Sequence, residues 1–477
     1  MNYKLMLRMM GLTLLVETLL LLLPLAVTLI YREDPAPFLY TILPLALAGI
    51  LLSRIKSRSD FFSREGFVVV GLIWVVLSLF GALPFWFSGY FECFSDCFFE
   101  VVSGFTTSGA TILADIERLP RGILFWRSFT SWIGGMGVLL FTLAFLPKVG
   151  GRAHVLIQAE VPGPISTKLV PKTVQSAKIL YEIYFALTAL EIMAFSAAGM
   201  PLYDAVVTTF ASVCTGGFSV MNASFAAYNT TCQIIAIVFM ILGSLNFAVF
   251  FLLFTGRGKQ ALKSDELHFF LGVVAVCALM VFVNILPLYD SIGTAFKDAL
   301  FQVASIVSTS GFSTTDYNLW PPFSQTILVI LMFIGGCSGS TAGSIKCGRV
   351  LLATRTSTRT LLRFSHPRAV KVVKLDGKAV EEDTLNTVFA FFILFFLLLG
   401  AGSLVVSLDG YSLTTSFTAS LGCLSNVGPG LDGVGPMANF SGLSHLSKWL
   451  LSALMLIGRL ELFPILLLLH PTTWSRA

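Results

Sequence analysis

The sequence predicts an all-α integral membrane protein with four helix, pore-helix, helix repeats in a pseudo-fourfold arrangement, preceded by two transmembrane helices. Three observations lead to this fold class. Of the 477 residues, 56% are hydrophobic and only 12% are charged, and the mean hydropathy is +0.84, whereas soluble proteins carry roughly 25% charged residues. Long apolar runs recur along the whole chain. Four shorter apolar stretches each end in a small-residue tetrad and are followed by a long run.

Ten apolar runs meet the requirement of about 20 residues for a transmembrane helix. They lie near residues 5–30, 37–53, 67–88, 124–146, 177–199, 231–255, 266–287, 323–350, 384–407 and 446–469. The first run follows Lys4 and Arg8, as the core of a secretory signal would. However, it is longer than a signal core and no small-residue cleavage site follows it, so we expect a retained helix.

Four tetrads with glycine in third place divide the rest of the chain into repeats. They are Thr107-Ser108-Gly109-Ala110, Thr215-Gly216-Gly217-Phe218, Thr309-Ser310-Gly311-Phe312 and Asn426-Val427-Gly428-Pro429. Successive glycines lie 108, 94 and 117 positions apart, which indicates one supersecondary unit used four times. The predicted boundaries are 1–60 for an N-terminal two-helix unit and 61–150, 175–257, 264–355 and 380–470 for pore repeats 1 to 4.

The apolar stretch before each tetrad predicts a short helix that enters and leaves the membrane on the same side. These stretches cover residues 92–104, 202–212, 292–305 and 412–420. A helix of about 12 residues, at about 1.5 Å per residue, reaches only halfway through the hydrocarbon core. Non-helical backbone at that depth must be buried in protein or line water. We therefore expect the tetrads to converge on a wet axis.

A ring of such loops is typical of an ion pore. Glycine permits positive φ, which lets carbonyl oxygens face one direction, and four loops together can replace the hydration shell of a monovalent cation. Each short helix would also point its negative C-terminal dipole at the water below. One tetrad alone is most simply an ordinary loop between helices. Four at matched positions favour a filter.

The basic residues predict the orientation. With the N-terminus in the cytoplasm, 24 of the 31 lysines and arginines lie on the inner side, as the positive-inside rule requires. The tetrads then lie in the outer half of the membrane. The net charge of +5 thus reflects topology and does not indicate nucleic-acid binding. The outer segments are rich in acids, which would raise the local cation concentration at an entrance. A plain solvated outer surface explains any one of these acids equally well.

The predicted span at 323–350 contains a glycine-rich interruption. Its segment from Gly335 to Lys346 includes Gly336, Gly339 and Gly343 among serines and a threonine. Each glycine weakens a helix by about 1 kcal/mol, and a broken helix again needs a cavity. We expect a movable loop beneath the tetrads that acts as a gate. The alternative is close helix packing through small residues.

Arg459 is the candidate for a charge inside the pore. It lies 11 positions after Lys448, roughly 16 Å deeper along a helix and near the midplane. An intramembrane charge faces the bundle interior or water and is a functional candidate. We expect an electrostatic barrier to cation leakage below the tetrads. The alternative is a structural ion pair with Glu461 or Glu100.

The segments around the tetrads resemble the TrkH/TrkG/KtrB group of potassium transporters. They are residues 103–111, 213–219, 308–314 and 424–431, and the resemblance covers nearly the whole chain. The two extra N-terminal spans are more similar to TrkH and TrkG than to KtrB. The resemblance implies a transported potassium ion, with ligands in the first three residues of each tetrad: Thr107, Ser108, Gly109, Thr215, Gly216, Gly217, Thr309, Ser310, Gly311, Asn426, Val427 and Gly428. The four glycines favour potassium over sodium, and the fourth tetrad is the least regular.

The same resemblance implies partners for the basic segment 346–383. This segment carries nine bases and suits either acidic lipid headgroups or a regulatory protein. The resemblance favours a homodimer that sits on a cytosolic nucleotide-binding ring of the TrkA or KtrA type. The chain has no phosphate-binding glycine loop of its own, so we expect no organic cofactor on it. The implied location is a plasma membrane, the inner membrane of a bacterium.

Other functions remain as alternatives. A proton- or sodium-coupled potassium symporter on the same scaffold is the nearest one, because sequence does not separate coupled from uncoupled transport. A secondary transporter of an organic solute is more distant, since such proteins commonly use two inverted repeats. The five histidines are dispersed and no nucleophile-base constellation occurs, which argues against an enzyme. The eight scattered cysteines lack a metal-binding spacing and are expected to be small buried residues.

Overall fold

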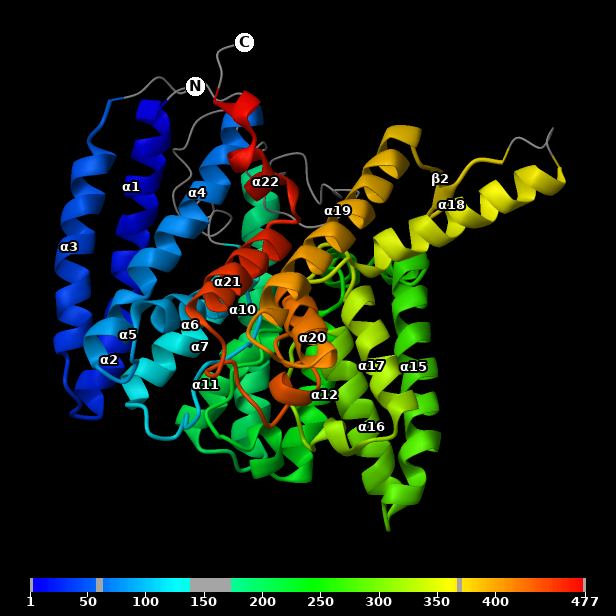
Figure 1. Ribbon diagram of the computed structural model, residues 1–477, viewed down its shortest axis with the longest axis horizontal. Helices are drawn as coiled ribbons and strands as arrows, with labels where there is room; N and C mark the ends of the chain where they lie inside the picture. The colour runs from blue at the N-terminus through cyan, green and yellow to red at the C-terminus, as the bar shows by residue number, and fades with distance from the viewer. Residues whose placement is uncertain (1–2, 57–62, 138–172, 367–370, 475–477) are drawn as a thin grey trace.

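The computed structural model describes residues 3–56, 63–137, 173–366 and 371–474, and nearly all of its regular structure is helical. At one edge of the molecule, α1 (Tyr3–Leu20) and α2 (Leu22–Ile30) form one span, and α3 (Ala36–Ser53) packs back against α1 (Figure 1). Gly11 permits this approach, because a methyl group on it would lie 2.5 Å from Ser53 N. Small residues at such contacts let helices associate in lipid.

Each of the four following units has a long first helix, a short helix and a second helix. The first helices are α4 (Ser63–Gly81) with α5 (Leu83–Ser88), α10 (Thr173–Ala197), α15 (Asp265–Ile285) and α19 (Glu382–Ser407). The short helices are α6 (Phe94–Phe105), α11 (Leu202–Val213), α16 (Ile292–Val307) and α20 (Leu413–Leu424). The second helices are α7 (Arg121–Gly135), α12 (Thr230–Gly243) with α13 (Phe247–Phe254), α17 (Pro322–Ile334) with α18 (Cys347–Ser365), and α21 (His445–Arg459) with α22 (Phe463–Leu469).

Minor elements connect these helices. They are α14 (Gly258–Ala261), the 3-10 turns Ser224–Ala227, Leu286–Leu288, Tyr317–Leu319, Asp432–Val434 and Pro471–Thr473, and a hairpin of β1 (Lys374–Leu375) and β2 (Lys378–Ala379). The hairpin and the far end of α18 extend sideways from the bundle (Figure 1). The predicted fold class, all-α with repeated helix, short-helix, helix units, is confirmed.

The repeats close into a ring. Each short helix packs against the first helix of its own repeat, and each second helix packs against the short helix of the next repeat. The pairs of the second kind are α7 with α11, α12 with α16, α17 with α20, and α21 with α6. The last pair joins the fourth repeat to the first. This cyclic order of helix contacts makes the arrangement of the four repeats pseudo-fourfold.

The outer surface of the ring suits lipid. The first helices α15 and α19 are long and apolar, yet only 28% of the apolar window of each is buried. Exposed side chains on them include Leu279, Val283, Leu397 and Leu404. A helix that is hydrophobic all round needs either a protein core or a bilayer around it. The short helices, in contrast, lie in the protein interior, and α6 is buried from Ser95 to Phe105.

Six helices in the described part of the chain are long and apolar enough to span a membrane, or seven if one bent pair counts as a span. The other predicted spans are the second helices of the repeats, and three of them break within the described residues. The predicted interruption of 323–350 is present between α17 and α18. The end of 124–146 lies outside the described residues.

Continuous spans at 231–255 and 446–469 are wrong predictions. The axis turns by 92° between α12 and α13, where the Asn246 side chain accepts a hydrogen bond from Ala248 N and starts a new helix. Between α21 and α22, Glu461 and Leu462 have φ of 55° and 66°. Pro464 then stands in the first turn of α22, where its missing N–H costs nothing.

Candidate functional site

All four short helices end in the same backbone motif, which fixes the position of the tetrads. In the first repeat, Thr107 N donates to Gly104 O and Ser108 N donates to Ser103 O, both at 2.8 Å. These are the two bonds of a Schellman C-cap. The matching bonds elsewhere are Thr215 to Ser212 and Gly216 to Ala211, Thr309 to Ile306 and Ser310 to Ser305, and Asn426 to Cys423 and Val427 to Gly422.

Each tetrad has two residues in the left-handed region of backbone conformation. The first residues, Thr107, Thr215, Thr309 and Asn426, have φ of 55°, 56°, 60° and 53°. The third residues are glycines with φ of 78°, 72°, 76° and 92°. A residue with a side chain pays about 1 kcal/mol or more for this conformation. Asparagine adopts this conformation readily, but three threonines held there indicate strain that the surrounding structure imposes, as is common at functional sites.

The four tetrads form a closed ring in which each glycine abuts a carbonyl oxygen of the next tetrad. A methyl group placed on Gly109 would lie 2.8 Å from Gly216 O, and one on Gly217 would lie 1.7 Å from Ser310 O. A methyl group on Gly311 would lie 2.2 Å from Val427 O, and one on Gly428 would lie 2.5 Å from Ser108 O. The tetrad of each repeat thus contacts the tetrad of the next repeat, and the tetrad of repeat 4 contacts that of repeat 1. Since no Cβ fits at these positions, the ring requires glycine at all four corners.

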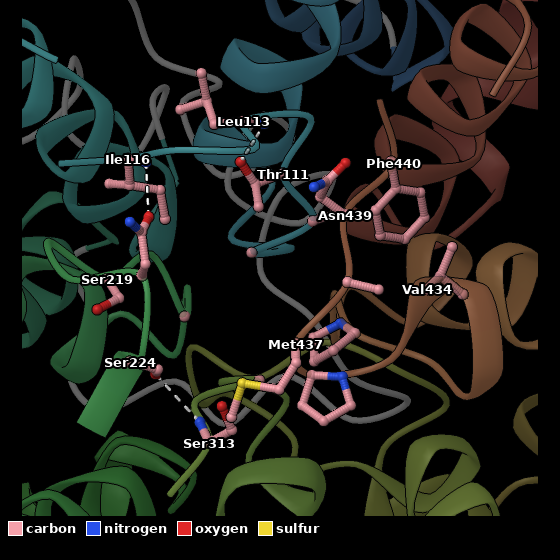
Figure 2. Close-up of a pocket in the computed structure, with 18 of the residues that line it drawn as sticks. Thr111, Leu113, Ile116, Ser219, Ser224, Ser313, Val434, Met437, Asn439 and Phe440 are labelled. Atoms are coloured by element: carbon pink, nitrogen blue, oxygen red, sulfur yellow. Dashed lines mark hydrogen bonds between the residues drawn. The ribbon is translucent and has the colours of Figure 1, made fainter. Parts of the chain in front are cut away.

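A cavity of about 170 Å³ opens on one side of the ring. Every tetrad contributes to its lining, the first through Gly109 and Ala110 and the others through Gly217, Gly311 and Pro429. Figure 2 shows side chains from the segments that follow the tetrads around this cavity, among them Thr111, Ser219, Ser313 and Asn439. The lining is mostly hydroxyl, amide and small apolar groups, a surface that admits a hydrated ion.

The acids near this cavity are held in their charged form. Asp115 accepts a hydrogen bond from Asn222 Nδ2 (2.9 Å), and this bond lowers the pKa of the Asp115 carboxyl. Ser412 and Thr415 likewise lower the pKa of Asp432 by donating to it. Carboxylates at the mouth of a cleft attract cations.

The segment 335–346 lies against the other side of the ring. Gly343 N donates to Thr309 Oγ1 (2.8 Å), and a methyl group on Gly343 would lie 2.4 Å from Ser425 O, next to the fourth tetrad. Thr341 Oγ1 donates to Gly243 O (2.9 Å) and lies 3.4 Å from Thr215 Oγ1 of the second tetrad. This segment therefore touches three of the four corners.

The predicted gate residues all lie in this segment. Gly335 ends α17 with φ of 68°, and Gly339 has φ of 70° with Asn246 beside it. Gly336 is close to Ala342 and Ser244. Lys346 is buried, has φ of 78°, and donates from Nζ to Ala342 O. The break occurs because the positive φ angles at Gly335, Gly339 and Lys346 do not continue a right-handed helix.

Arg459 reaches the remaining corner. Its guanidinium donates to Thr107 Oγ1 (3.1 Å) of the first tetrad and to Thr341 O (2.8 Å) of the 335–346 segment. It also donates to Gly134 O and Gly135 O at 2.7 and 2.6 Å. These carbonyls end α7, where a cation is favoured by the helix dipole. The two acids considered as its partners bind other arginines: Glu461 pairs with Arg349, and Glu100 with Arg127.

Sequence reasoning did not single out Thr341, Glu266 or the Glu100–Arg127 pair as site residues. Glu266 accepts a hydrogen bond from Ser338 N of the 335–346 segment at 2.6 Å. Glu100 and Arg127 lie beside the first two tetrads, 2.6 Å apart. Glu266, Glu100 and Arg127 could have been found as charged residues in or beside an apolar run, because an ion is stable there only with a partner. Thr341 gave no such signal.

Comparison with known proteins places the whole chain in one group. The model of the TrkH family, described as cation transport protein, matches residues 36–475. The chain is 36% identical to the Trk system potassium uptake protein TrkH of Vibrio parahaemolyticus, over 99% of this chain and all of the relative. It is 32% identical to the Trk system potassium uptake protein TrkG of Escherichia coli, over 94% of each.

A solved structure agrees with these relatives. The crystal structure of the potassium transporter TrkH from Vibrio parahaemolyticus matches with a TM-score of 0.89 and 35% sequence identity, over the full length of both chains.

Proposed function

This chain belongs to the TrkH family of cation transport proteins, and from that premise we propose that it takes up potassium ions through one filter per chain. It is a multi-pass membrane transporter and not an enzyme. In this proposal the ion ligands are the first three residues of each tetrad. The four repeats are residues 61–150, 175–257, 264–355 and 380–470, and residues 1–60 form a separate two-helix unit.

The observation that carries this proposal is the closed ring of tetrads. Four Schellman caps direct four equivalent loops to one axis, and each glycine packs on the next loop's carbonyl oxygen. Backbone carbonyls in such a ring replace the water around a monovalent cation and select it by the number and placement of oxygens. No covalent chemistry is needed for this function.

We propose that the 335–346 segment is the gate and that Arg459 sets the barrier. The segment touches the second, third and fourth tetrads and Arg459 bonds to the first, so together they close the inner side of the ring. Opening requires the Thr341 and Gly343 bonds to break. Serine, threonine and glycine backbone is suited to this, since it offers other hydrogen-bond partners when the segment moves.

A contact chain supports control of this gate from the cytosol. Asp265 and Asp376 exchange two hydrogen bonds, from Asp265 N to Asp376 Oδ1 (2.7 Å) and from Asp376 N to Asp265 Oδ2 (3.0 Å). Arg355 of α18 pairs with Asp265 at 2.7 Å. The next residue, Glu266, holds Ser338 of the gate segment. Movement of the β1–β2 hairpin would therefore be transmitted to the gate segment through Asp265 and Glu266.

We propose that the partner is a nucleotide-binding ring in the cytosol and that two copies of this chain sit on it. Leu361 and Phe364, exposed by 69% and 82% on the projecting part of α18, support a protein contact there. The bases of the same region support contact with acidic lipid headgroups as well. The proposed location is a bacterial inner membrane with the N-terminus in the cytoplasm, which the distribution of lysine and arginine supports.

The proposed uptake is tested with the purified chain in proteoliposomes. Under a potassium gradient, we expect a current whose reversal potential follows potassium and is unaffected by proton or sodium gradients. A reversal potential that moves with a proton or sodium gradient would establish the coupled symporter instead. Absence of potassium flux, with uptake of an organic solute, would overturn the proposed function.

A further inference from the structure

The Glu100–Arg127 pair lies buried beside the tetrad ring, outside the ion ligands and the gate. Both residues are 1% exposed, and Arg127 Nε donates to Glu100 Oε1 at 2.6 Å. A buried ion pair carries a large desolvation cost, and it gives less stability than its short distance suggests. Stability alone is therefore a weak explanation for the pair.

The acid of this pair holds the first tetrad's exit segment. Glu100 lies on the short helix α6. Its Oε1 also accepts from Thr111 Oγ1 (2.9 Å), and its Oε2 accepts from Ile112 N (3.0 Å). Thr111 and Ile112 directly follow Gly109-Ala110. The carboxylate thus holds the segment after this tetrad with two hydrogen bonds, one to a side-chain hydroxyl and one to the backbone.

The arginine holds the exit segment of the second tetrad. Arg127 NH1 donates to Ser219 O (3.0 Å), and its guanidinium lies over the Phe218 ring, 3.7 Å from the ring centre. Phe218 is the last residue of the second tetrad. Figure 2 shows Thr111 and Ser219 on neighbouring sides of the cavity that opens above the ring. One ion pair therefore ties two adjacent corners together.

The other corners are held differently. In the third repeat, Asp298 Oδ1 accepts from Thr314 Oγ1 (3.0 Å). In the fourth, Thr418 Oγ1 accepts from Leu431 N (3.0 Å). Each of these bonds joins a short helix to its own exit segment. Hydrogen bonds also join the exit segments of neighbouring repeats at every junction: Ile116 N to Asn222 Oδ1, Ser313 N to Ser224 Oγ, Asp432 N to Asn318 Oδ1 and Phe440 N to Thr111 O. The Glu100–Arg127 pair differs from these because it is a buried ion pair, and it holds the exit segments of two repeats next to their tetrads.

We infer that Glu100 and Arg127 are positioning residues that set ion selectivity by fixing the first two tetrads relative to each other. This inference rests on the proposed potassium filter. Selection between potassium and sodium depends on where the ring holds its carbonyl oxygens. Without the pair, the Asn222 bond to Ile116 still joins the two exit segments, but they lose their shared buried anchor next to the tetrads, and the oxygens can approach a smaller ion.

The test measures potassium and sodium permeability of purified full-length variants in proteoliposomes. Arg127→Lys keeps the charge but not the fork that reaches both Glu100 and Ser219. Glu100→Gln keeps the size but not the charge. We expect each to lower the ratio of potassium to sodium permeability about tenfold, a change of about 1.4 kcal/mol. Thr111→Val removes one hydroxyl bond, leaves the ion pair intact, and should lower the ratio about twofold.

Arg121→Lys is the matched control. Arg121 begins the same helix, but its guanidinium lies over the Tyr31 and Tyr203 rings, away from the tetrads. Its selectivity should equal that of the unsubstituted chain. Folded variants at Glu100, Arg127 and Thr111 with unchanged selectivity would overturn the inference while the proposed function stands. An unsubstituted chain without selective potassium flux would overturn both. If the Glu100 and Arg127 variants do not fold, the selectivity of Thr111→Val alone decides the test.

Discussion

The half of this transporter that contains the tetrads, which is the outer half in the proposed orientation, and the opposite, inner half are built on opposite plans. In the outer half, four short helices end in the same cap, and four tetrads have nearly the same φ angles. In the inner half, the second helices differ: α12 and α13 meet at 92°, a twelve-residue segment separates α17 from α18, and α21 leads to α22 through Glu461 and Leu462. Symmetry is kept where ions would be coordinated and lost where flow would be controlled.

The physical reason lies in what each half must do. A cation on an axis is held best by equivalent oxygens on all sides, so four equal corners are favoured. A gate needs an element with two arrangements, and a single mobile segment provides them without moving the other three repeats. In our proposal the 335–346 segment is that element, and Arg459, which donates to Thr341 O, is the charge that complements it.

The largest effect is expected from filling a corner of the ring. Gly217→Ala would place a methyl group 1.7 Å from Ser310 O. Overpacking of this kind costs about 1–3 kcal/mol even in cores that relax, and the left-handed φ adds about 1 kcal/mol. We expect potassium uptake to be lost in potassium-uptake-deficient cells. Gly199→Ala is the control, since Gly199 has φ of 90° with no atom within 4 Å of the added methyl, and it should retain uptake. Normal uptake by Gly217→Ala would remove the basis for a tightly packed ring.

The second largest effect is expected in the inner half. Deleting residues 336–343 should raise basal potassium conductance in proteoliposomes, because the segment then no longer covers the ring. Thr341→Val, which removes the hydroxyl bound to Gly243 O, should raise it less. Thr326→Val is the control, because that exposed hydroxyl bonds within its own helix. A folded deletion protein with unaltered conductance would leave only close helix packing as the role of these glycines.

A smaller effect is expected at Arg459. Arg459→Gln keeps donors for Gly134 O and Gly135 O but removes the charge near Thr107. Basal potassium flux should rise severalfold, and stability should fall by about 1 kcal/mol from the lost charge at the end of α7. Flux and melting temperature of the purified protein measure the two separately. Lower stability with unchanged flux would assign Arg459 a purely structural role.

The smallest effect on the ion path is expected at Glu266. Glu266→Ala frees Ser338 N, so activation by the cytosolic partner should weaken while the potassium to sodium ratio stays the same. Glu381→Ala, an exposed acid at the start of α19, serves as the control. Equal activation of both variants by the partner, measured as flux with and without it, would contradict the contact chain from the hairpin to the gate.

Sequence patterns predicted the outer half more fully than the inner half. The expected short helices at 92–104, 202–212, 292–305 and 412–420 overlap the observed ones, because length and apolar content determine them. Glycine spacing identified the corners, because no other residue fits there. The cap at each tetrad was not foreseen, since threonine in the left-handed region is an imposed conformation and not a preferred one.

The breaks in the inner half depend on tertiary contacts that periodicity does not report. Ser244 and Asn246 form a weak polar interruption in an apolar run, yet the 92° turn there also makes room for Gly339. At the fourth repeat, Glu461 and Pro464 were signals for a break that a hydropathy pattern averages out. The partners of Glu100 and Arg127 were not predictable, because residues far apart in the chain meet only in the folded ring.

One measurement tests the central claim that four equivalent tetrads form one potassium filter. Gly109, Gly217, Gly311 and Gly428 are each replaced by serine in separate chains, and the ratio of potassium to sodium permeability is measured in proteoliposomes. The account predicts that every folded, conducting variant loses selectivity, whichever corner is changed. A variant that conducts with the unsubstituted chain's selectivity would show that its corner does not line the filter, and it would contradict the account.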